Sequence, residues 1–370
     1  MQPPYSDELN IGDLSRVFDR NRVSNSYKYF WFKAIVNNVS YDKTRFTYDE
    51  LINEMIVSAY YMVNEYNLRL GPCNTVDNLE EVSKYIYKEY HYPSTVKDSV
   101  LQAFLETTED SKIKEYKKTL TYNVPYCLQS PFYTDLKSPS KAKVDEINKC
   151  KRLLYYFVAI NNMASEIEIN EIWLDYLVCN REILKCWMDY KLIGWLQDRN
   201  PSVPGISDKI SYPLKRELKK VRDYWKLVID IDGSIKEIYD DVDMSDESVS
   251  IDHFVPWQYV AHDELWNLHP TTKSLNSQKS NYLPGWTYFS ELGELQYRAY
   301  LLKGKNERVA EEFDKCAQYH LNQADIRQQL YVPGLEKNEF IVRLSNILLP
   351  VYKSAQLCGF KEWFHEKENV

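Results

Sequence analysis

The sequence has 370 residues, enough chain for two or three modest domains, and its formal net charge of −8 argues against a protein that coats nucleic acid with its whole surface. Only 10 residues are glycine, well under half of the usual ~7%, so we do not expect a fold that depends on glycine-rich phosphate loops. Hydrophobic residues make up 44% and charged residues 27%, which is typical of globular proteins and excludes wholesale disorder.

The sequence predicts a cytoplasmic protein without membrane contact. Its N-terminal residues lack the basic and apolar stretches of a signal peptide, and no apolar run approaches the ~18 residues that span a bilayer. The seven cysteines are odd in number and scattered, and none form a C-x-x-C pair. We therefore expect reduced thiols and no structural zinc.

Residues 1–205 are predicted to form an N-terminal helical domain. A dense aromatic segment at 24–36 predicts a buried helix, with a strand as the alternative for so short a run. The sequence Thr47-Tyr-Asp-Glu50 is a capping-box signature, and apolar residues at helical spacing follow it. A second helix is therefore predicted to begin there.

A further helical region is predicted from about residue 165 to 198, where apolar side chains recur at three- and four-residue spacing. Cys179 and Cys186 share one face of that helix, and we expect both to be core thiols. The loop Asn200–Gly205 contains two prolines and a glycine, so a domain boundary is predicted near it.

The composition changes beyond this loop. Residues 209–226, here called the basic segment, contain seven lysines or arginines and two acidic residues, a local net charge of +5. Two apolar stretches, 226–231 and 235–239, flank Asp232-Gly-Ser234, and this pattern predicts a β-hairpin. Helical periodicity returns after residue 286.

Residues 252–279 contain polar side chains of the types that form catalytic sites. A short apolar segment ends in the pair Asp252-His253, and a second short strand contains Asn267. A helix after it is predicted to carry Asn276 and Lys279 on one face. Two strands and a helix of this kind would hold oxygen ligands for a divalent ion beside a histidine base. An isolated Asp-His pair is more often structural, so the prediction depends on the combination.

The order and spacing of these residues resemble the HNH, or ββα-metal, endonuclease family. His253 precedes Asn267 by fourteen positions, Asn267 precedes Asn276 by nine, and Asn276 precedes Lys279 by three. These gaps look like those of the HNH domain of the RNA-guided CRISPR nucleases. The resemblance covers about residues 225–285, and it departs from the family name at the third position. There Asn276 replaces histidine but still supplies an oxygen ligand suited to Mg²⁺.

The resemblance implies a role for each of these residues. His253 would take a proton from water as the general base, and Asn267 would fix the loop that aims it. Asp252 and Asn276 would hold one Mg²⁺ or Mn²⁺ ion per site, and Lys279 would pair with a phosphate. Many family members also carry cysteine pairs for a structural zinc, which this sequence lacks.

The basic segment is the candidate for tracking a phosphate backbone. On a helix, Lys215, Lys219 and Arg222 would share one face. With Lys279 and Asn281 they are the residues predicted to bind nucleic acid. A solvated helix face explains the basic segment about equally well, but its position directly before the HNH-like window favours contact with DNA.

Other polar residues near the window receive structural interpretations. We expect His262 and His269 to be structural or solvated, because they lie off the motif positions. The aspartates of residues 230–243 do not have the spacing of a calcium loop, so an acidic, solvated turn is expected instead.

The predicted fold is mainly α with a small α+β insert. It consists of an N-terminal helical domain at 1–205, a ββα-metal HNH nuclease module at 206–286 and a C-terminal helical region at 287–370. The predicted function is a metal-dependent endonuclease, a hydrolase that cleaves DNA. Family analogy adds a role in bacterial restriction or antiviral defence, with an ATPase or another defence-system subunit as partner. Two alternatives stay open: an RNA-cleaving, toxin-type HNH nuclease, and a non-catalytic scaffold that binds DNA or a partner protein.

Overall fold

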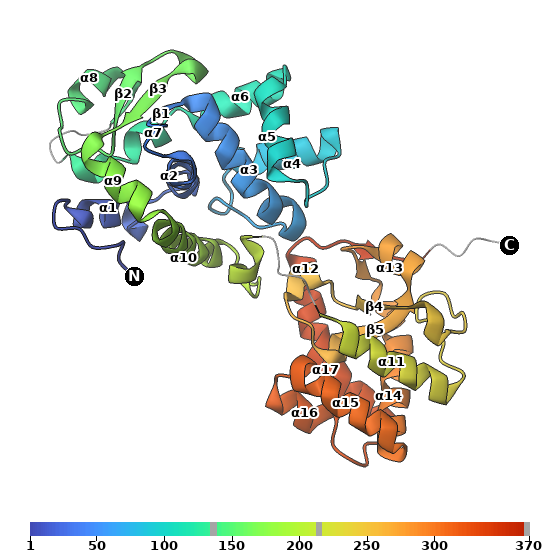
Figure 1. Ribbon diagram of the computed structural model, residues 1–370. Coiled ribbons are helices and arrows are strands. Elements are labelled where there is room, and N and C mark those ends of the chain that lie inside the picture. Colours follow the sequence, from blue (N-terminus) through green and yellow to red (C-terminus); the bar gives the residue numbers. More distant parts are fainter. Residues whose placement is uncertain (134–138, 212–216, 366–370) are drawn as a thin grey trace. The chain divides into compact units, whose positions relative to one another are not determined.

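The computed structural model describes residues 1–133, 139–211 and 217–365, and it divides into two compact units (Figure 1). Unit 1 comprises Met1–Pro201 and Ile206–Tyr212, and unit 2 comprises Ser202–Gly205 and Pro213–Val370. Helices dominate both units, and the described strands form three small sheets, so the prediction of a mainly α protein is confirmed. Among the described helices, none combines the length and the low polarity needed to cross a membrane.

Unit 1 is a helical body with one small sheet. Its strands β1 (Arg45–Thr47), β3 (Glu166–Ile169) and β2 (Tyr155–Ala159) pair antiparallel in that order. Its α-helices are α1 (Ile11–Val17), α2 (Tyr27–Asn38), α3 (Tyr48–Tyr66), α4 (Asn78–Tyr90), α5 (Asp98–Thr107), α6 (Ser111–Leu120), α7 (Val124–Cys127), α8 (Val144–Ile147), α9 (Glu171–Cys179) and α10 (Arg181–Arg199).

Two helices of unit 1 form where local signals predict them. The aromatic segment lies in α2, where Phe30, Trp31 and Phe32 are all buried, so it is a helix and not a strand. Helix α3 begins with the predicted capping box. Thr47 Oγ1 accepts from the backbone N–H of Glu50 (3.1 Å), and the Glu50 carboxylate accepts from the N–H of Thr47 (2.7 Å). These bonds satisfy two of the N–H groups that a helix start leaves unpaired.

The helical region predicted from about residue 165 to 198 is confirmed from residue 171 onward but is wrong at its start. Residues Glu166–Ile169 form strand β3, and the remainder is the two helices α9 and α10, which are separated at Asn180. The strand forms because its two isoleucines face the core and its backbone pairs with β1 and β2. Cys179 and Cys186 are both exposed, so the prediction of core thiols is also wrong.

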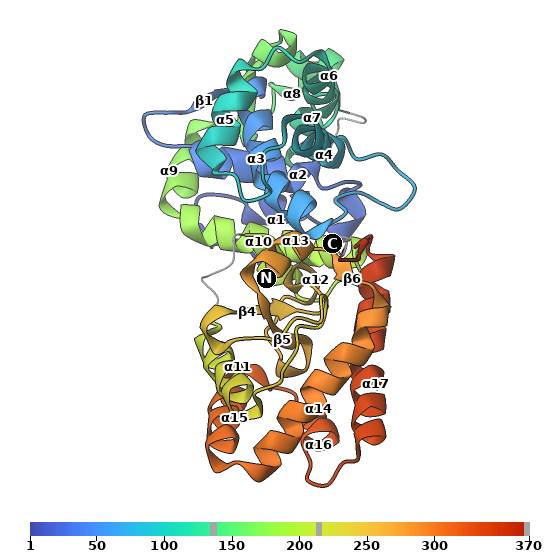
Figure 2. The ribbon, with the colours of Figure 1, turned by 90° about the vertical axis from the view of Figure 1, so that its right-hand side faces the viewer.

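Unit 2 contains the residues that resemble an HNH site. Strands β4 (Val249–His253) and β5 (Leu268–Thr272) pair antiparallel, and β6 (Leu283–Pro284) and β7 (Glu362–Trp363) pair parallel. The α-helices are α11 (Lys219–Asp232), α12 (Trp257–Val260), α13 (Lys273–Lys279), α14 (Phe289–Lys305), α15 (Glu307–His320), α16 (Ala324–Leu330) and α17 (Lys337–Leu357). Figure 2 shows α14 alongside α17 and α11 alongside α15, and both pairs are in contact.

The predicted β-hairpin at 226–239 is wrong. Its first half is the end of helix α11, and Gly233 follows in the left-handed conformation (φ 68°) that often ends a helix. Residues 235–239 form only an isolated bridge, between Lys236 and Asp243. The short apolar run within α11 suits a strand when read alone, but together with the basic segment it continues a helical pattern. The buried residues of α11 recur at that spacing: Val221, Tyr224, Trp225, Val228 and Ile229.

One hydrophobic core joins the small sheet of unit 2 to the C-terminal helices. Trp225 of α11 and Ile251 of β4 belong to the same cluster of buried residues as Leu292 of α14 and Leu344 of α17. Burial of a shared core means that α14–α17 support the sheet. The division of the chain into 1–205, 206–286 and 287–370 stays a prediction.

Candidate active site

Strands β4 and β5 and helix α13 bring the predicted site residues together. In the register of the two strands, Asp252 lies opposite His269 and His253 lies opposite Leu268. Helix α13 follows β5 directly, and the hydroxyl of Thr272 caps it by accepting from the N–H of Leu275 (3.2 Å). A cavity of about 160 Å³ is lined by residues of β4, α12 and α13, by the segment directly after α13 and by the residue before α11, among them Leu218, Asp252, His253, Asn276, Lys279 and Asn281.

Asn267 ties together the two ends of the loop between the strands. Its side chain is fully buried. Its Nδ2 donates to the carbonyl oxygen of Val255 and its Oδ1 accepts from the N–H of Val255, each at 2.8 Å. Its own carbonyl oxygen accepts from the N–H of Phe254 (2.9 Å). These three bonds hold the two residues that directly follow His253.

Asp252 is a buried carboxylate with three polar partners. Lys279 Nζ lies 3.1 Å away, the hydroxyl of Tyr239 donates to Oδ2 at 3.0 Å, and His269 Nε2 lies at 3.4 Å. Burial acts to raise the pKa of Asp252, but the charge of Lys279 and the hydrogen bond from His269 outweigh it and hold that pKa well below its ordinary value. Asp252 is therefore ionised at neutral pH.

Lys279 is fully buried at the end of α13. Its ammonium group donates to Asp252 Oδ1 (3.1 Å) and to the carbonyl oxygen of His253 (2.8 Å). From sequence we expect this residue to pair with a phosphate, whereas in the structure Asp252 neutralises its charge. The contact arises because α13 packs against β4, and a buried charge requires a partner of opposite sign.

Asn276 is half-buried on α13, one turn before Lys279. Its Nδ2 donates to Ser250 Oγ (2.9 Å) and to the carbonyl oxygen of Ile251 (3.0 Å). Both bonds use the amide nitrogen, so the amide oxygen is the atom suited to another ligand. Asn276 and Asp252 line the same cavity. An amide oxygen and a carboxylate are ligands that Mg²⁺ takes while keeping several waters, so these residues fit such an ion.

Within the described ranges, no group of three or more histidine, cysteine, aspartate or glutamate side chains could hold a metal ion. Two of the aspartates expected in an acidic turn are instead paired with basic residues. Asp232 pairs with Arg298, and Asp241 pairs with Lys236 (3.0 Å). The metal-site candidate stays the pair Asp252 and Asn276, which supply two protein oxygens on one cavity.

His253 is buried at the end of β4, and its Nε2 lies 2.8 Å from Asp263 Oδ1. Asp263 belongs to the loop between β4 and β5, and its side chain is 19% exposed. Asp263 is not one of the residues predicted from the sequence. An aspartate in a loop carries no local signal that would distinguish it from a solvated residue.

The surroundings of Asp252 also include Tyr239, Glu237 and His269. The hydroxyl of Tyr239 lies 3.2 Å from His269 Nε2, and Glu237 accepts from the hydroxyl of Thr271 (2.7 Å) and from the N–H of Tyr239 (2.5 Å). Burial raises the pKa of both Tyr239 and Glu237. The pattern at 235–239 predicts a strand and carries no signal for these contacts. His269 is fully buried, in agreement with the structural interpretation.

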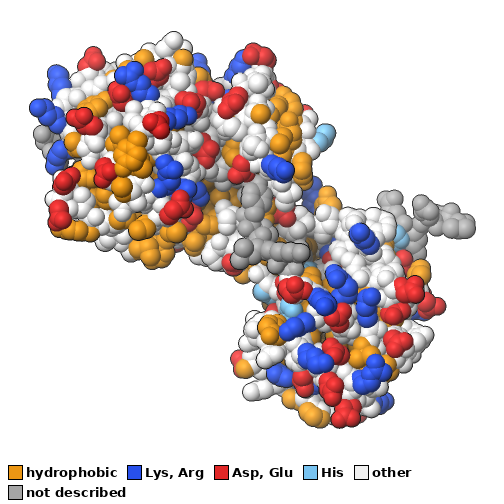
Figure 3. Space-filling view, in the orientation of Figure 1, with side chains coloured by type: hydrophobic (Ala, Val, Ile, Leu, Met, Phe, Trp, Pro, Cys, Tyr) orange, Lys and Arg blue, Asp and Glu red, His pale blue; other side chains and the backbone are white. Residues whose placement is uncertain are grey.

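The residues predicted to bind nucleic acid lie in different environments. Lys219 and Arg222 are exposed on the first turn of α11, directly after Leu218, which lines the cavity. Asn281 is half-buried and lines the cavity too, whereas Lys215 lies outside the described residues. On the face of unit 2 drawn in Figure 3, lysine and arginine side chains alternate with aspartate and glutamate. That face is therefore not a continuous basic surface.

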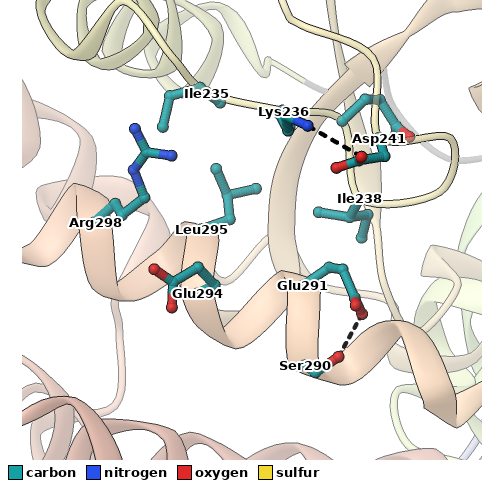
Figure 4. Close-up of a pocket in the computed structure, with 10 residues that line it drawn as sticks. Ile235, Lys236, Ile238, Asp241, Ser290, Glu291, Glu294, Leu295 and Arg298 are labelled. Atoms are coloured by element: carbon teal, nitrogen blue, oxygen red, sulfur yellow. Dashed lines mark hydrogen bonds and ion pairs between the residues drawn. The ribbon is translucent and has the colours of Figure 1, made fainter.

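A second cavity of unit 2, of about 250 Å³, lies between α14 and the segment after α11 (Figure 4). Charged side chains that line it have polar or charged partners within the fold. Lys236 pairs with Asp241 (3.0 Å), Ser290 donates to Glu291 (2.6 Å), and Arg298 pairs with Asp232. This cavity is therefore a poor candidate for the reaction site.

Comparison with known proteins identifies one family. Residues 236–285 match the model of a family described as HNH endonuclease. Neither the curated proteins nor the solved structures provide a match to this chain. The matched segment includes all the motif residues of the site: Asp252, His253, Asn267, Asn276 and Lys279. This segment is similar to HNH endonucleases, and it indicates that the protein contains a nuclease domain.

Proposed function

We propose that this protein is a metal-dependent endonuclease that hydrolyses phosphodiester bonds in DNA. The observation that carries the proposal is the convergence of Asp252, His253 and Asn276 on one cavity. A carboxylate, an amide oxygen and an imidazole are groups that assist phosphodiester hydrolysis when they surround one phosphate. The pairing of β4 with β5 and the helix α13 that follows support the assignment of a ββα-metal module.

His253 is proposed as the general base. Imidazole has an ordinary pKa near neutrality, so a histidine can take a proton from water under physiological conditions. Proton transfer of this kind contributes about 10²–10⁴-fold to a rate. The hydrogen bonds of Asn267 to Phe254 and Val255 support its proposed role in aiming His253, because they hold the backbone directly after the base.

Asp252 and Asn276 are proposed to hold one Mg²⁺ or Mn²⁺ ion. When bound, the ion supplies positive charge at the scissile phosphate and at the leaving oxygen. The low pKa of Asp252 supports the assignment, since the carboxylate is already ionised near neutral pH. In the structure Lys279 compensates that charge, and its pairing with a phosphate is proposed for the complex with substrate.

The residues proposed to contact the nucleic-acid backbone are Lys215, Lys219, Arg222 and Asn281. Helix α11 supports this, because it begins beside the cavity and exposes Lys219 and Arg222 on its first turn. DNA is the proposed substrate, with 5′-phosphate and 3′-hydroxyl products. By family analogy, the proposed setting is bacterial restriction or antiviral defence in the cytoplasm, where an ATPase or another subunit directs the nuclease.

Cleavage of supercoiled plasmid and of a long RNA, each with Mg²⁺, Mn²⁺ or EDTA, tests the proposal. The variants are His253→Ala and, as a matched control, His91→Asn. His91 is exposed at the end of α4 in the left-handed conformation (φ 56°), which asparagine adopts readily. We expect metal-dependent nicking or linearisation of DNA by the wild type and His91→Asn, with loss in His253→Ala.

The other outcomes separate the alternatives. Cleavage of RNA but not of DNA would show that the substrate is RNA. Full activity in His253→Ala would contradict the assignment of the base. A wild type that binds DNA but cleaves neither polymer would favour the non-catalytic scaffold.

A further inference from the structure

The proposed base makes a side-chain contact that the motif spacing does not assign. His253 Nε2 lies 2.8 Å from Asp263 Oδ1, a distance typical of a charge-assisted hydrogen bond. An ionised carboxylate only accepts hydrogen bonds, so in this pair the hydrogen lies on Nε2 and the basic lone pair lies on Nδ1. His253 lines the cavity, and Asp263 is not one of the residues that do.

Asp263 is itself held by residues beyond the segment that matches the HNH family. His320, the last residue of α15, has its Nδ1 2.9 Å from the backbone carbonyl oxygen of Asp263. The next residue, Glu264, is buried, and its carboxylate accepts from the backbone N–H (3.1 Å) and the side-chain amide (2.9 Å) of Asn322. The end of α15 thus fixes two consecutive loop residues, one of which contacts His253.

We infer that Asp263 is a positioning residue for the reaction and that the end of α15 holds it in place. Asp263 fixes the ring orientation of His253 and its Nε2–H tautomer, so that Nδ1 is the nitrogen that takes the proton. The inference rests on the proposed function, because it assigns a partner to the proposed base. It also gives α15, which lies outside the family match, a part in the active site.

The tautomer of His253 tests the contact whether or not the protein cleaves nucleic acid. Nitrogen NMR of the full chain, labelled with ¹⁵N-histidine, distinguishes Nε2–H from Nδ1–H, and the spectrum of His253→Ala assigns the signal. At a pH of about 8.5, above the ordinary pKa of histidine, we expect the Nε2–H form in the wild type. We expect Asp263→Ala to lose this preference and the control Asp230→Ala to keep it, since Asp230 is exposed on α11.

The kinetic test separates positioning from substrate binding. Asp263→Ala should lower kcat about tenfold to a hundredfold, by analogy with the range for partners that orient metal-bound histidines. KM should change little, and Asp263→Glu should recover part of the loss. Asp230→Ala should cleave like the wild type.

Several results would overturn the inference. One is an Nδ1–H tautomer of His253 in the wild type, and another is an Asp263→Ala variant with unchanged tautomer and kcat. If Asp263→Ala fails to fold, Asn322→Ala at an exposed position provides the second test. It should weaken the tautomer preference and lower kcat by a smaller factor, and unchanged values for both would overturn the inference. A wild type that cleaves nothing would refute the proposed function, while the tautomer would still decide the role of Asp263.

Discussion

Asn267 binds the backbone of Val255 through both ends of its side-chain amide, each hydrogen bond measuring 2.8 Å. Since Asn267 is fully buried, its removal leaves two backbone groups without partners, at a cost of about 1–3 kcal/mol each. We expect Asn267→Ala to lower the free energy of unfolding by about 2–4 kcal/mol and to reduce cleavage. Urea unfolding followed by tryptophan fluorescence measures the first effect. Asn338→Ala, at an exposed position of α17, is the matched control and should stay within about 0.5 kcal/mol of the wild type.

The buried pair of Lys279 and Asp252 predicts a pH-dependent stability. The pKa of Asp252 in the folded protein lies below the value of about 3.9 for an unfolded chain. The ionised carboxylate therefore contributes stability that is complete above about pH 4 and is lost as the pH falls toward the folded-state pKa. Lys279→Met removes the cation and should cost about 3–5 kcal/mol at pH 7.5.

Lowering the pH should partly rescue the Lys279→Met variant. Without the cation, burial raises the pKa of Asp252, so the carboxyl takes up a proton as the pH approaches 4 and the variant regains stability. Denaturant unfolding at pH 7.5 and at about pH 4 measures the difference in the free energy of unfolding between wild type and variant. An equal difference at the two pH values would show that the charge of Asp252 is not what Lys279 compensates.

Lys279 and a divalent ion would compete for the Asp252 carboxylate. A Lys279→Met variant that remains folded should therefore bind Mn²⁺ more tightly than the wild type. The dissociation constant for Mn²⁺ should fall about tenfold, which corresponds to about 1.4 kcal/mol of binding free energy. Asp252→Asn should bind more weakly than the wild type, because it loses the anionic ligand. Isothermal titration calorimetry measures both, and weaker binding by Lys279→Met would contradict competition.

The first turn of α11 predicts a salt-dependent contact with DNA. Lys219→Ala and Arg222→Ala should each weaken binding of a short duplex, and each lost phosphate contact should reduce the slope of log affinity against log salt by about 0.9. Fluorescence anisotropy over a series of KCl concentrations measures the slope. Lys315→Ala is the control, since Lys315 is an exposed lysine of α15 that pairs with Glu312. Equal slopes for all the proteins would contradict a role of α11.

Local patterns in the sequence predict some elements of this protein and misplace others. The capping box from Thr47 to Glu50 predicts the start of α3 because both of its hydrogen bonds join residues three apart. The apolar run in α11 predicts a strand, whereas the segment that forms β3 is predicted to be helical. Both predictions fail because short apolar runs suit either structure. In these two cases the packing partners decide the structure: the core of unit 2 for α11, and the strands β1 and β2 for β3.

The sequence by itself determines the resemblance to HNH endonucleases and the motif residues that carry it, because gaps of fourteen, nine and three positions can be read along the chain. Only the tertiary structure decides what those residues contact. Lys279 reaches Asp252 because α13 packs on β4, and Asp263 is held by His320, which lies 57 residues further along the chain. Such contacts come from the packing of whole elements around one core, and that packing depends on residues far apart in the sequence.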